Sequence, residues 1–180
     1  MSEAPIRVGI IVGSTRPGRF GPTIAKWFAS VATRRPDVAV DMIDLADAET
    51  SEPGRLSAHL TNADAFVVVT PEYNHSFPAP LKAAIDAHDV EWHRKPVGFV
   101  SYGGISGGLR AVEHLRAVFA ELQASTVRHS VSFQSAPDRF DDSGQPRDPD
   151  LVDRAAMRML DDLLWWGLAL RDARARRPFR

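Results

Sequence analysis

The chain contains no cysteine among its 180 residues, which excludes disulfides, thiolate nucleophiles and cysteine metal ligands. A chain of this length buries roughly 70% of its unfolded surface without such links, so we expect one domain over residues 1–180. The absence of cysteine fits a reducing compartment, and we expect a cytoplasmic protein. No apolar run approaches the ~20 residues that span a bilayer, and no signal-like segment opens the chain. We therefore expect no contact with a membrane.

A strong net charge is also lacking. The whole chain carries −1, but residues 171–180 hold five Arg and one Asp, which gives +4 there and leaves about −5 on the first 170 residues. Such a basic segment can contact nucleic acid, phosphate or the acidic face of a neighbouring subunit. At a chain end we expect a solvated, frayed tail and no nucleic-acid partner.

Short apolar runs rich in β-branched residues alternate with amphipathic helical patterns. We expect strands at residues 6–12, 38–44, 65–70, 97–102 and 126–133. Helices are expected from Pro22, over 53–62, from Pro80, from Leu109 and over 151–170, the last after a polar stretch at 137–150. Alternation of this kind is typical of right-handed βαβ units and a parallel sheet. The fold expected is α/β, a flavodoxin-like three-layer sandwich with a five-stranded sheet in the order 2-1-3-4-5 and helices on both faces.

The loop after the first strand carries hydroxyls and guanidinium groups at a helix N-terminus. Unpaired N–H groups and the helix dipole favour an anion there. Ser14 can donate to a phosphate, and Arg16 and Arg19 can pair with it. Phe20 stands where a P-loop needs Ser or Thr for magnesium, and Thr15 where a dinucleotide fingerprint needs its second glycine. A phosphate site of another kind is the hypothesis, and a glycine-rich turn with solvated arginines is the alternative.

The loop after the third strand leaves a buried run with rigid, aromatic and polar residues. Pro71 fixes the chain, Tyr73 offers an aromatic surface, and the Asn74 amide suits both a turn and contacts to a ring. Glu72 is expected to accept from backbone N–H groups and lock the loop. The alternative is a plain Pro/Asn turn.

The loop after the fourth strand offers hydroxyls and bare backbone at Ser101, Tyr102, Gly103 and Gly104. Missing side chains leave room for a flat ring. In the expected strand order, all three loops meet at the crevice where such sheets bind ligands.

At these residues the chain resembles the NADPH-dependent FMN reductase family, flavodoxin-like enzymes that include quinone, azo-dye and chromate reductases. The resemblance covers roughly residues 6–170. It rests on Gly13-Ser14-x-Arg16 and on Pro71-Glu72-Tyr73-Asn74-x-Ser76 followed by Pro78-x-x-Leu81-Lys82-x-x-Ile85-Asp86.

The resemblance implies a place for each part of FMN. The phosphate would be held by Ser14, Arg16 and the turn Arg19, Phe20, Gly21 and Pro22. The ribityl chain and isoalloxazine would be lined by Pro71, Glu72, Tyr73 and Asn74, and the ring edge would meet Ser101, Tyr102, Gly103 and Gly104. His75 and Tyr102 are the residues we assign to an acceptor pocket.

The implied function is an oxidoreductase that passes a hydride from NADPH or NADH through bound FMN to a quinone or similar small acceptor, or that reduces free FMN. The flavin supplies the chemistry, so we assign no catalytic side chain and no metal ligand. Two alternatives stay open. One is a flavodoxin-type electron carrier that binds FMN without NAD(P)H turnover, although such carriers are strongly acidic. The other is a flavin-free binding or scaffold protein on the same fold.

The last helix has more apolar surface than one sheet face covers. Met157, Leu164, Trp165 and Leu168 are expected opposite Val152, Met159, Leu163 and Trp166. We expect a dimer or tetramer that hides the second face, with a helix wedged deeper in the core as the alternative.

Overall fold

A computed structural model describes residues 4–47 and 54–177 of the protein. Its five strands form one sheet in the order β2-β1-β3-β4-β5, and every neighbouring pair is parallel. The strands are β1 (Ile6–Val12), β2 (Val38–Asp44), β3 (Ala65–Pro71), β4 (Pro96–Gly103) and β5 (Ser125–Gln134). The predicted fold class and strand order are confirmed.

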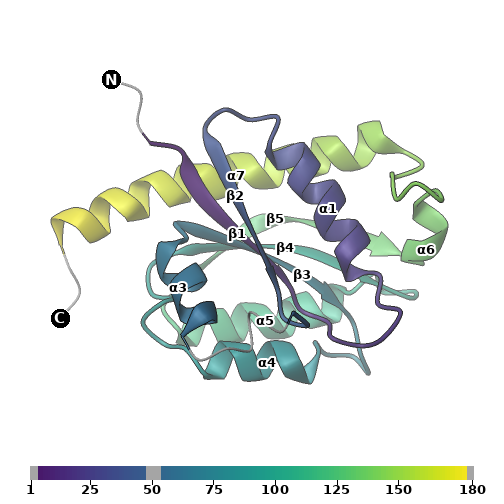
Figure 1. The fold of residues 1–180 in the computed structure, drawn as a ribbon, viewed down its shortest axis with the longest axis horizontal. Coiled ribbons are helices and arrows are strands. Elements are labelled where there is room, and N and C mark those ends of the chain that lie inside the picture. Colours follow the sequence, from purple (N-terminus) through teal and green to yellow (C-terminus); the bar gives the residue numbers. More distant parts are fainter. Residues whose placement is uncertain (1–3, 48–53, 178–180) are drawn as a thin grey trace.

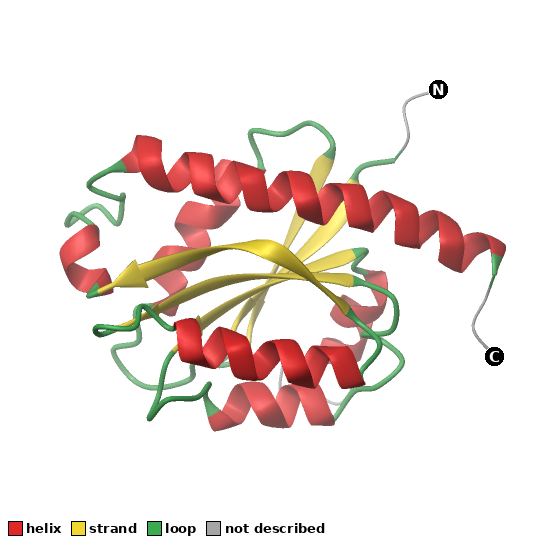
Figure 2. Ribbon diagram, turned by 180° about the vertical axis from the view of Figure 1, so that it is seen from behind, coloured by secondary structure: helices red, strands yellow, loops and turns green. Residues whose placement is uncertain are grey.

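Helices cover both faces of the sheet (Figures 1 and 2). One face carries α1 (Gly21–Ala32) and α7 (Pro149–Arg176), and the other carries α3 (Arg55–Asn62), α4 (Ala79–Asp86) and α5 (Leu109–Glu121). The short α6 (Ala136–Arg139) follows β5 directly. The helix predicted over 53–62 thus begins at Arg55, and its predicted first residue lies outside the described residues.

Side chains of the strands alternate between two hydrophobic clusters, one on each side of the sheet. Val8 and Ile10 belong to the cluster under α1 and α7, whereas Ile11 belongs to the cluster over α3, α4 and α5. All seven residues of β3 are buried, as expected of a central parallel strand covered on both faces. No helix in the described part of the chain is both long and apolar enough to cross a membrane.

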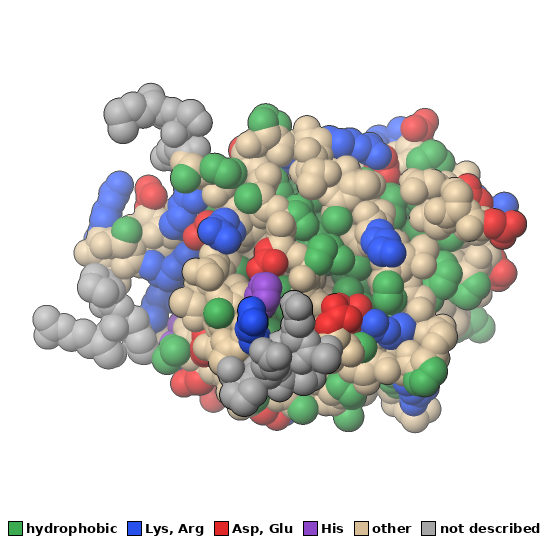
Figure 3. All heavy atoms as spheres, viewed as in Figure 1, with side chains coloured by type: hydrophobic (Ala, Val, Ile, Leu, Met, Phe, Trp, Pro, Cys, Tyr) green, Lys and Arg blue, Asp and Glu red, His purple; other side chains and the backbone are tan. Residues whose placement is uncertain are grey.

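The prediction of a frayed basic tail is wrong as far as Arg176, because α7 continues through it. Arg171 donates to the Pro5 carbonyl at 3.3 Å, and Arg174 donates to the Arg94 carbonyl at 2.6 Å. Both guanidinium groups also lie 3.4 Å from the Asp64 carboxylate. Figure 3 shows Lys and Arg side chains gathered over this end of α7, at the left of the view. These contacts order a segment whose composition alone suggests a solvated tail.

The polar stretch at 137–150 contains local structure that its composition does not reveal. It includes most of α6, and Phe140 pairs with Pro146 in an isolated antiparallel bridge. The Phe140 ring lies 5.0 Å from that of Phe133 and 5.3 Å from that of Phe20, centroid to centroid. One buried aromatic side chain therefore anchors a loop that is otherwise polar.

The prediction of two separate apolar faces on α7 is partly wrong. Leu164, expected on the outer face, is buried in the same cluster as Met159 and Leu163. α7 crosses the sheet and also packs on α1, so neighbouring residues on a wide arc of the helix all meet protein. The large apolar side chains left exposed in its C-terminal half are Trp165, 64% exposed, and Trp166, 41% exposed.

Candidate functional site

Three loops meet at the carboxyl ends of β1, β3 and β4 because these strands are neighbours in the sheet. The Gly13 N–H donates to the Val69 carbonyl at 2.9 Å, which ties the first loop to β3. The Glu72 N–H donates to the Tyr102 carbonyl at 2.9 Å, which ties the second loop to β4. The expected convergence of the three loops is therefore present.

The first and second loops are joined through Ser14 and Tyr73. The Ser14 side chain is buried, and its hydroxyl lies 2.6 Å from the Tyr73 hydroxyl. The Arg16 guanidinium stacks on the same ring, with its central carbon 3.7 Å from the ring centroid. A cation–π contact of this kind holds a positive charge at the mouth of the loop while leaving its N–H groups free to meet an anion.

Arg19 is paired within the protein. Its guanidinium meets both Asp44 carboxylate oxygens, at 2.5 and 2.8 Å, and donates to the Ser14 carbonyl at 2.7 Å. Hydrogen bonding to Asp44 raises the pKa of Arg19 despite the opposing effect of its partial burial. This pairing fixes the loop to the end of β2, and a direct contact of Arg19 with a phosphate stays a prediction that the geometry does not favour.

The remainder of the Arg19–Pro22 turn contributes backbone more than side chains. Phe20 is the N-cap residue of α1 and packs edge-on against Phe140. Pro22 stands in the first turn of the helix, where its missing N–H costs nothing. A phosphate at this turn would therefore meet backbone N–H groups of the α1 N-terminus rather than the Phe20 side chain.

Glu72 joins the second loop to the third and to α5. Its carboxylate accepts from the Ser106 hydroxyl at 2.7 Å, from the Arg110 N–H at 3.2 Å and from the Arg110 guanidinium at 2.8 Å. Burial acts to raise the pKa of Glu72, but the bonds from Ser106 and Arg110 outweigh it and leave the pKa below its ordinary value. The carboxylate locks the loops together, which agrees with the structural role expected for it.

Asn74 and His75 form the tip of a two-residue turn with strained backbone. Tyr73 and Ser76 exchange both of their backbone hydrogen bonds, at 2.8 and 3.0 Å, and the two residues between them have φ of +50° and +68°. Glycine or asparagine is the usual choice where both central residues need positive φ. A histidine is an uncommon choice at the second of these positions, and its side chain is exposed.

The third loop is closely packed against its own strand. The Ser101 hydroxyl is buried and donates to the Gly107 carbonyl at 2.9 Å, so its direct contact with a ligand stays a prediction. Gly108 has φ of +87°, and a Cβ there would lie 2.7 Å from that of Ser101, so only glycine fits. Gly104, by contrast, has open space where a Cβ would be. The loop thus offers bare backbone to the crevice, as predicted.

Tyr102 lies apart from the other residue assigned to an acceptor pocket. Its side chain is only 7% exposed and lies under the first loop, whereas His75 is exposed at the tip of the turn. A Cβ added to Gly21 would come within 2.9 Å of the Tyr102 hydroxyl. Their pairing in one acceptor pocket stays a prediction that this placement does not support.

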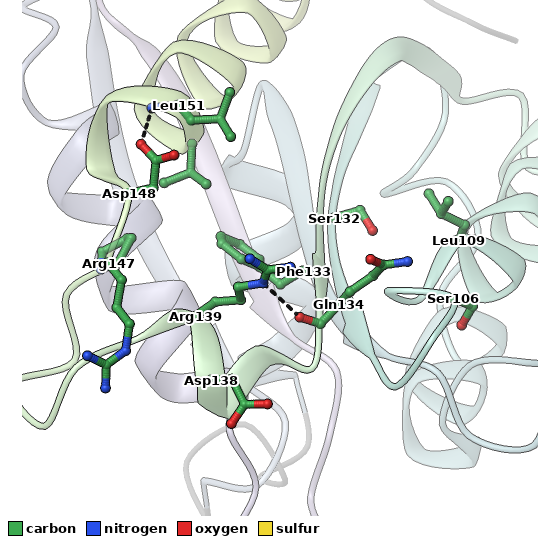
Figure 4. Close-up of a pocket in the computed structure, with 12 residues that line it drawn as sticks. Ser106, Leu109, Ser132, Phe133, Gln134, Asp138, Arg139, Arg147, Asp148 and Leu151 are labelled. Carbon is green, nitrogen blue, oxygen red and sulfur yellow. Dashed lines mark hydrogen bonds between the residues drawn. The ribbon is translucent and has the colours of Figure 1, made fainter.

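A cavity of about 440 Å³ lies beside the crevice rather than in it (Figure 4). It opens between the end of β5, α6 and the first turn of α7, and of the three loops only the third reaches it, through Ser106. Arg139 lies beside the Phe133 ring within it and donates to the Gln134 carbonyl at 3.3 Å. No local pattern in the sequence predicts this cavity, because its walls come together from segments far apart in the chain.

Comparison with known proteins identifies the family. Residues 6–138 match the family described as NADPH-dependent FMN reductase. The chain belongs to this family. It is 31% identical to a probable NADPH:quinone oxidoreductase of Oryza sativa, over 86% of this chain and 89% of that protein. It is also 36% identical to an NAD(P)H-dependent FMN reductase of Schizosaccharomyces pombe, over 57% of this chain and 60% of that protein.

The fold agrees with this membership. The flavoenzyme NAD(P)H:(acceptor) oxidoreductase FerB of Paracoccus denitrificans superposes with a TM-score of 0.71 over 89% of this chain and 97% of that one, at 19% identity. FMN is accordingly the cofactor of this family member, and NAD(P)H is its electron donor. The described residues fit FMN: the α1 N-terminus has no side-chain cap, Arg16 in the loop before it stacks on Tyr73 and suits a phosphate, and the Gly104 backbone leaves room for a ring.

Sequence reasoning missed the partners that hold the crevice in shape. Arg110 lies in the helix expected from Leu109, and nothing in that helical pattern predicts that it supplies two of the three bonds to Glu72. Asp44, the last residue of β2, accepts from the Ala46 N–H at 3.0 Å as a turn residue does, but its main partner is Arg19. A pairing across 25 residues leaves no mark in the local pattern.

Proposed function

We propose that this reductase binds FMN in the crevice between its three loops and passes a hydride from NAD(P)H to a quinone or a similar small acceptor. The quinone class follows from a relative that carries it in its name, the probable NADPH:quinone oxidoreductase of Oryza sativa. The observation that carries the proposal is the contact between Ser14 and Tyr73, 2.6 Å between hydroxyls, since it makes the phosphate loop and the ring loop one continuous wall.

FMN supplies the redox chemistry when bound, and the protein supplies binding and orientation. Arg16 and the N-terminus of α1 offset the phosphate charge at one end of the crevice. The Tyr73 ring and the Asn74–His75 turn form the wall beside the ribityl chain and ring. Glu72 keeps this wall at a fixed distance from the Gly104 backbone, so the cofactor meets a preformed shape.

The competing function is a flavodoxin-type electron carrier. Such carriers use strong negative charge to approach their partners, and this chain has a net charge of −1. The named relatives are reductases that use NAD(P)H, which favours turnover of a small acceptor.

A steady-state assay tests the proposal. Protein supplied with FMN is mixed with NADPH or NADH and a benzoquinone, and loss of nicotinamide absorbance is followed with and without each component. We expect oxidation that depends on protein, FMN and quinone together. A protein that takes up no FMN, or that shows no flavin-dependent oxidation of NAD(P)H, contradicts it.

We also propose that the chain self-associates as a dimer or tetramer through the outer side of α7, and that it acts in the cytoplasm. Trp165 and Trp166 support the first part, since their rings are exposed and pack edge to face with centroids 4.9 Å apart. Exposed tryptophan pairs are costly in water and common at protein interfaces. The lack of cysteine supports the second part.

A further inference from the structure

The Tyr102 hydroxyl is a buried polar group without a well-formed hydrogen bond in the described part of the chain, although the Gly21 N–H and the Ser14 hydroxyl lie near it. The residue is more than nine-tenths buried, and its oxygen has no hydrogen-bond partner within the described part of the chain. Leaving a hydroxyl buried and unpaired costs free energy, and phenylalanine would fill the same space without that cost. Buried groups of this kind are satisfied by an ordered water, an ion or a ligand.

This hydroxyl is directed at the first residue of α1. Gly21 begins the helix, and a Cβ there would come within 2.9 Å of the Tyr102 oxygen. Because α1 has 12 residues, its N-terminus has a developed dipole. Pro22 has no N–H, and the next two N–H groups of the helix bond the Phe20 carbonyl, which leaves the Gly21 N–H without a partner within the helix. The Tyr102 hydroxyl lies close to this N–H, and both groups can donate to an anion.

Two other donors of this turn, Arg19 and Ser14, already have partners within the protein, whereas Arg16 has no hydrogen-bond partner among the residues that the structure describes. Arg19 is paired with Asp44, and the Ser14 hydroxyl is bonded to that of Tyr73. Burial, followed by the nearness of Tyr73, raises the pKa of Tyr102, so the hydroxyl keeps its proton at neutral pH and can donate it in a hydrogen bond. Donation to an ionised oxygen is the strongest bond that a phenol can form here.

We propose that the Tyr102 hydroxyl donates a hydrogen bond to the FMN phosphate and makes the crevice selective for FMN over riboflavin. This inference rests on the proposed binding of FMN at the first loop. It moves Tyr102 from the acceptor pocket to the phosphate end of the crevice. It also explains why a tyrosine stands at the end of β4, where its hydroxyl destabilises the protein without flavin.

The test compares Tyr102→Phe with the wild type in two binding constants. Protein freed of flavin is titrated with FMN and, separately, with riboflavin, and flavin fluorescence is followed. We expect Tyr102→Phe to weaken FMN binding about 10-fold or more and to leave riboflavin binding unchanged, because only FMN carries the phosphate. The flavin-free variant is also expected to melt at least about 2 °C higher than the flavin-free wild type.

A matched control is Thr70→Val, which removes a buried hydroxyl from the neighbouring strand, where it bonds the Pro71 carbonyl at 3.1 Å. Its ratio of FMN to riboflavin affinity should equal that of the wild type. If Tyr102→Phe keeps the wild-type ratio, or weakens both flavins equally, the assignment to Tyr102 is overturned. If the wild type itself does not prefer FMN to riboflavin, the phosphate site at the first loop is wrong, which is a separate failure.

Discussion

Glu72 is a buried carboxylate that fixes the loops of the candidate site and has no assigned role in catalysis. Its side chain is 7% exposed and joins two loops and a helix through Ser106 and Arg110. Every one of these bonds links segments more than 30 residues apart. The shape of the crevice therefore depends on the Glu72 carboxylate, to which we assign a structural role and no catalytic one.

Glu72→Gln should loosen the crevice. An amide keeps the shape but loses the charge that pairs with Arg110, so we expect about 1–2 kcal/mol lower stability and several-fold weaker FMN binding. Chemical denaturation and an FMN titration measure the two effects. Glu113→Gln is the matched control, because Glu113 is 73% exposed and its ion pair with Arg116 spans 3.5 Å. Equal effects of the two substitutions would contradict the supporting role of Glu72.

Lys95 is expected to make the stability of the protein depend on pH. Its side chain is 6% exposed and donates to the Leu60 and Thr61 carbonyls at 2.7 and 3.1 Å, at the end of α3. Burial, followed by repulsion from Arg174, lowers the pKa of Lys95 from 10.5 to about 8. Between these values the unfolded chain holds a proton that the folded protein has released, so stability rises with pH in that range.

We expect the wild type to gain about 1–2 kcal/mol relative to Lys95→Met between pH 7.5 and pH 9.5. Urea denaturation at both pH values measures the difference, and groups common to both proteins cancel in it. Parallel pH dependences would show that Lys95 keeps its ordinary pKa in the folded protein.

At the scale of elements, the end of α7 acts as a brace across the start of three strands. Arg171 reaches Pro5 before β1, and Arg174 reaches Arg94 before β4. Both lie near Asp64, the residue before β3. The brace lies at the amino ends of the strands, and the crevice lies at their carboxyl ends. We therefore expect the brace to contribute to stability and not to ligand binding.

Arg174→Ala should lower the free energy of unfolding by about 1–2 kcal/mol, since it leaves the Arg94 carbonyl and Asp64 without this donor. Arg176→Ala is the control: that side chain is 79% exposed, and its ion pair among the described residues spans one turn of the same helix, with Asp172 at 3.6 Å. Its loss should cost less than about 0.5 kcal/mol. If the two variants melted at the same temperature, the stabilising role of Arg174 would be contradicted.

The elements of the fold could be predicted because their signals are local. β3 is a continuous apolar run, and α1 repeats Ile24, Trp27, Phe28 and Val31 at helical spacing, so strand order and layers followed from topology rules. The brace, α6 and the inward turn of Leu164 depend on contacts between distant segments. The composition of the basic segment predicts a solvated tail, because the sequence does not show that Asp64 lies beside Arg171 and Arg174.

The candidate site divides in the same way. The loops could be predicted from glycine, proline and polar residues at strand ends, and the structure brings those loops together. The roles inside them could not, because Arg19 pairs with Asp44, 25 residues further along the chain, and because Ser101 is occupied by the Gly107 carbonyl of its own loop, a bond that composition alone does not suggest. Tyr102 is the clearest case, since its hydroxyl belongs to the first loop although its backbone belongs to the third.

For the whole molecule, the Trp165–Trp166 pair is a large aromatic surface that a single chain leaves exposed. We expect the protein to sediment as a dimer or tetramer, and the double substitution Trp165→Gln with Trp166→Gln to shift it toward monomer. Because both side chains are largely exposed, a single folded chain should lose little stability from the change. Analytical ultracentrifugation measures the shift. An unchanged mass for the double variant would place the interface elsewhere or remove it.

The central claim is that the three loops form one FMN crevice in which the protein accepts electrons from NAD(P)H. The most direct measurement is the absorbance spectrum of the FMN-loaded protein, recorded without air before and after NADPH is added. The account predicts a bound-flavin spectrum whose absorbance near 450 nm, a property of the flavin itself, is lost rapidly with NADPH and returns when a benzoquinone is added. Bound flavin that NADPH and NADH both fail to bleach would contradict the account and favour an electron carrier.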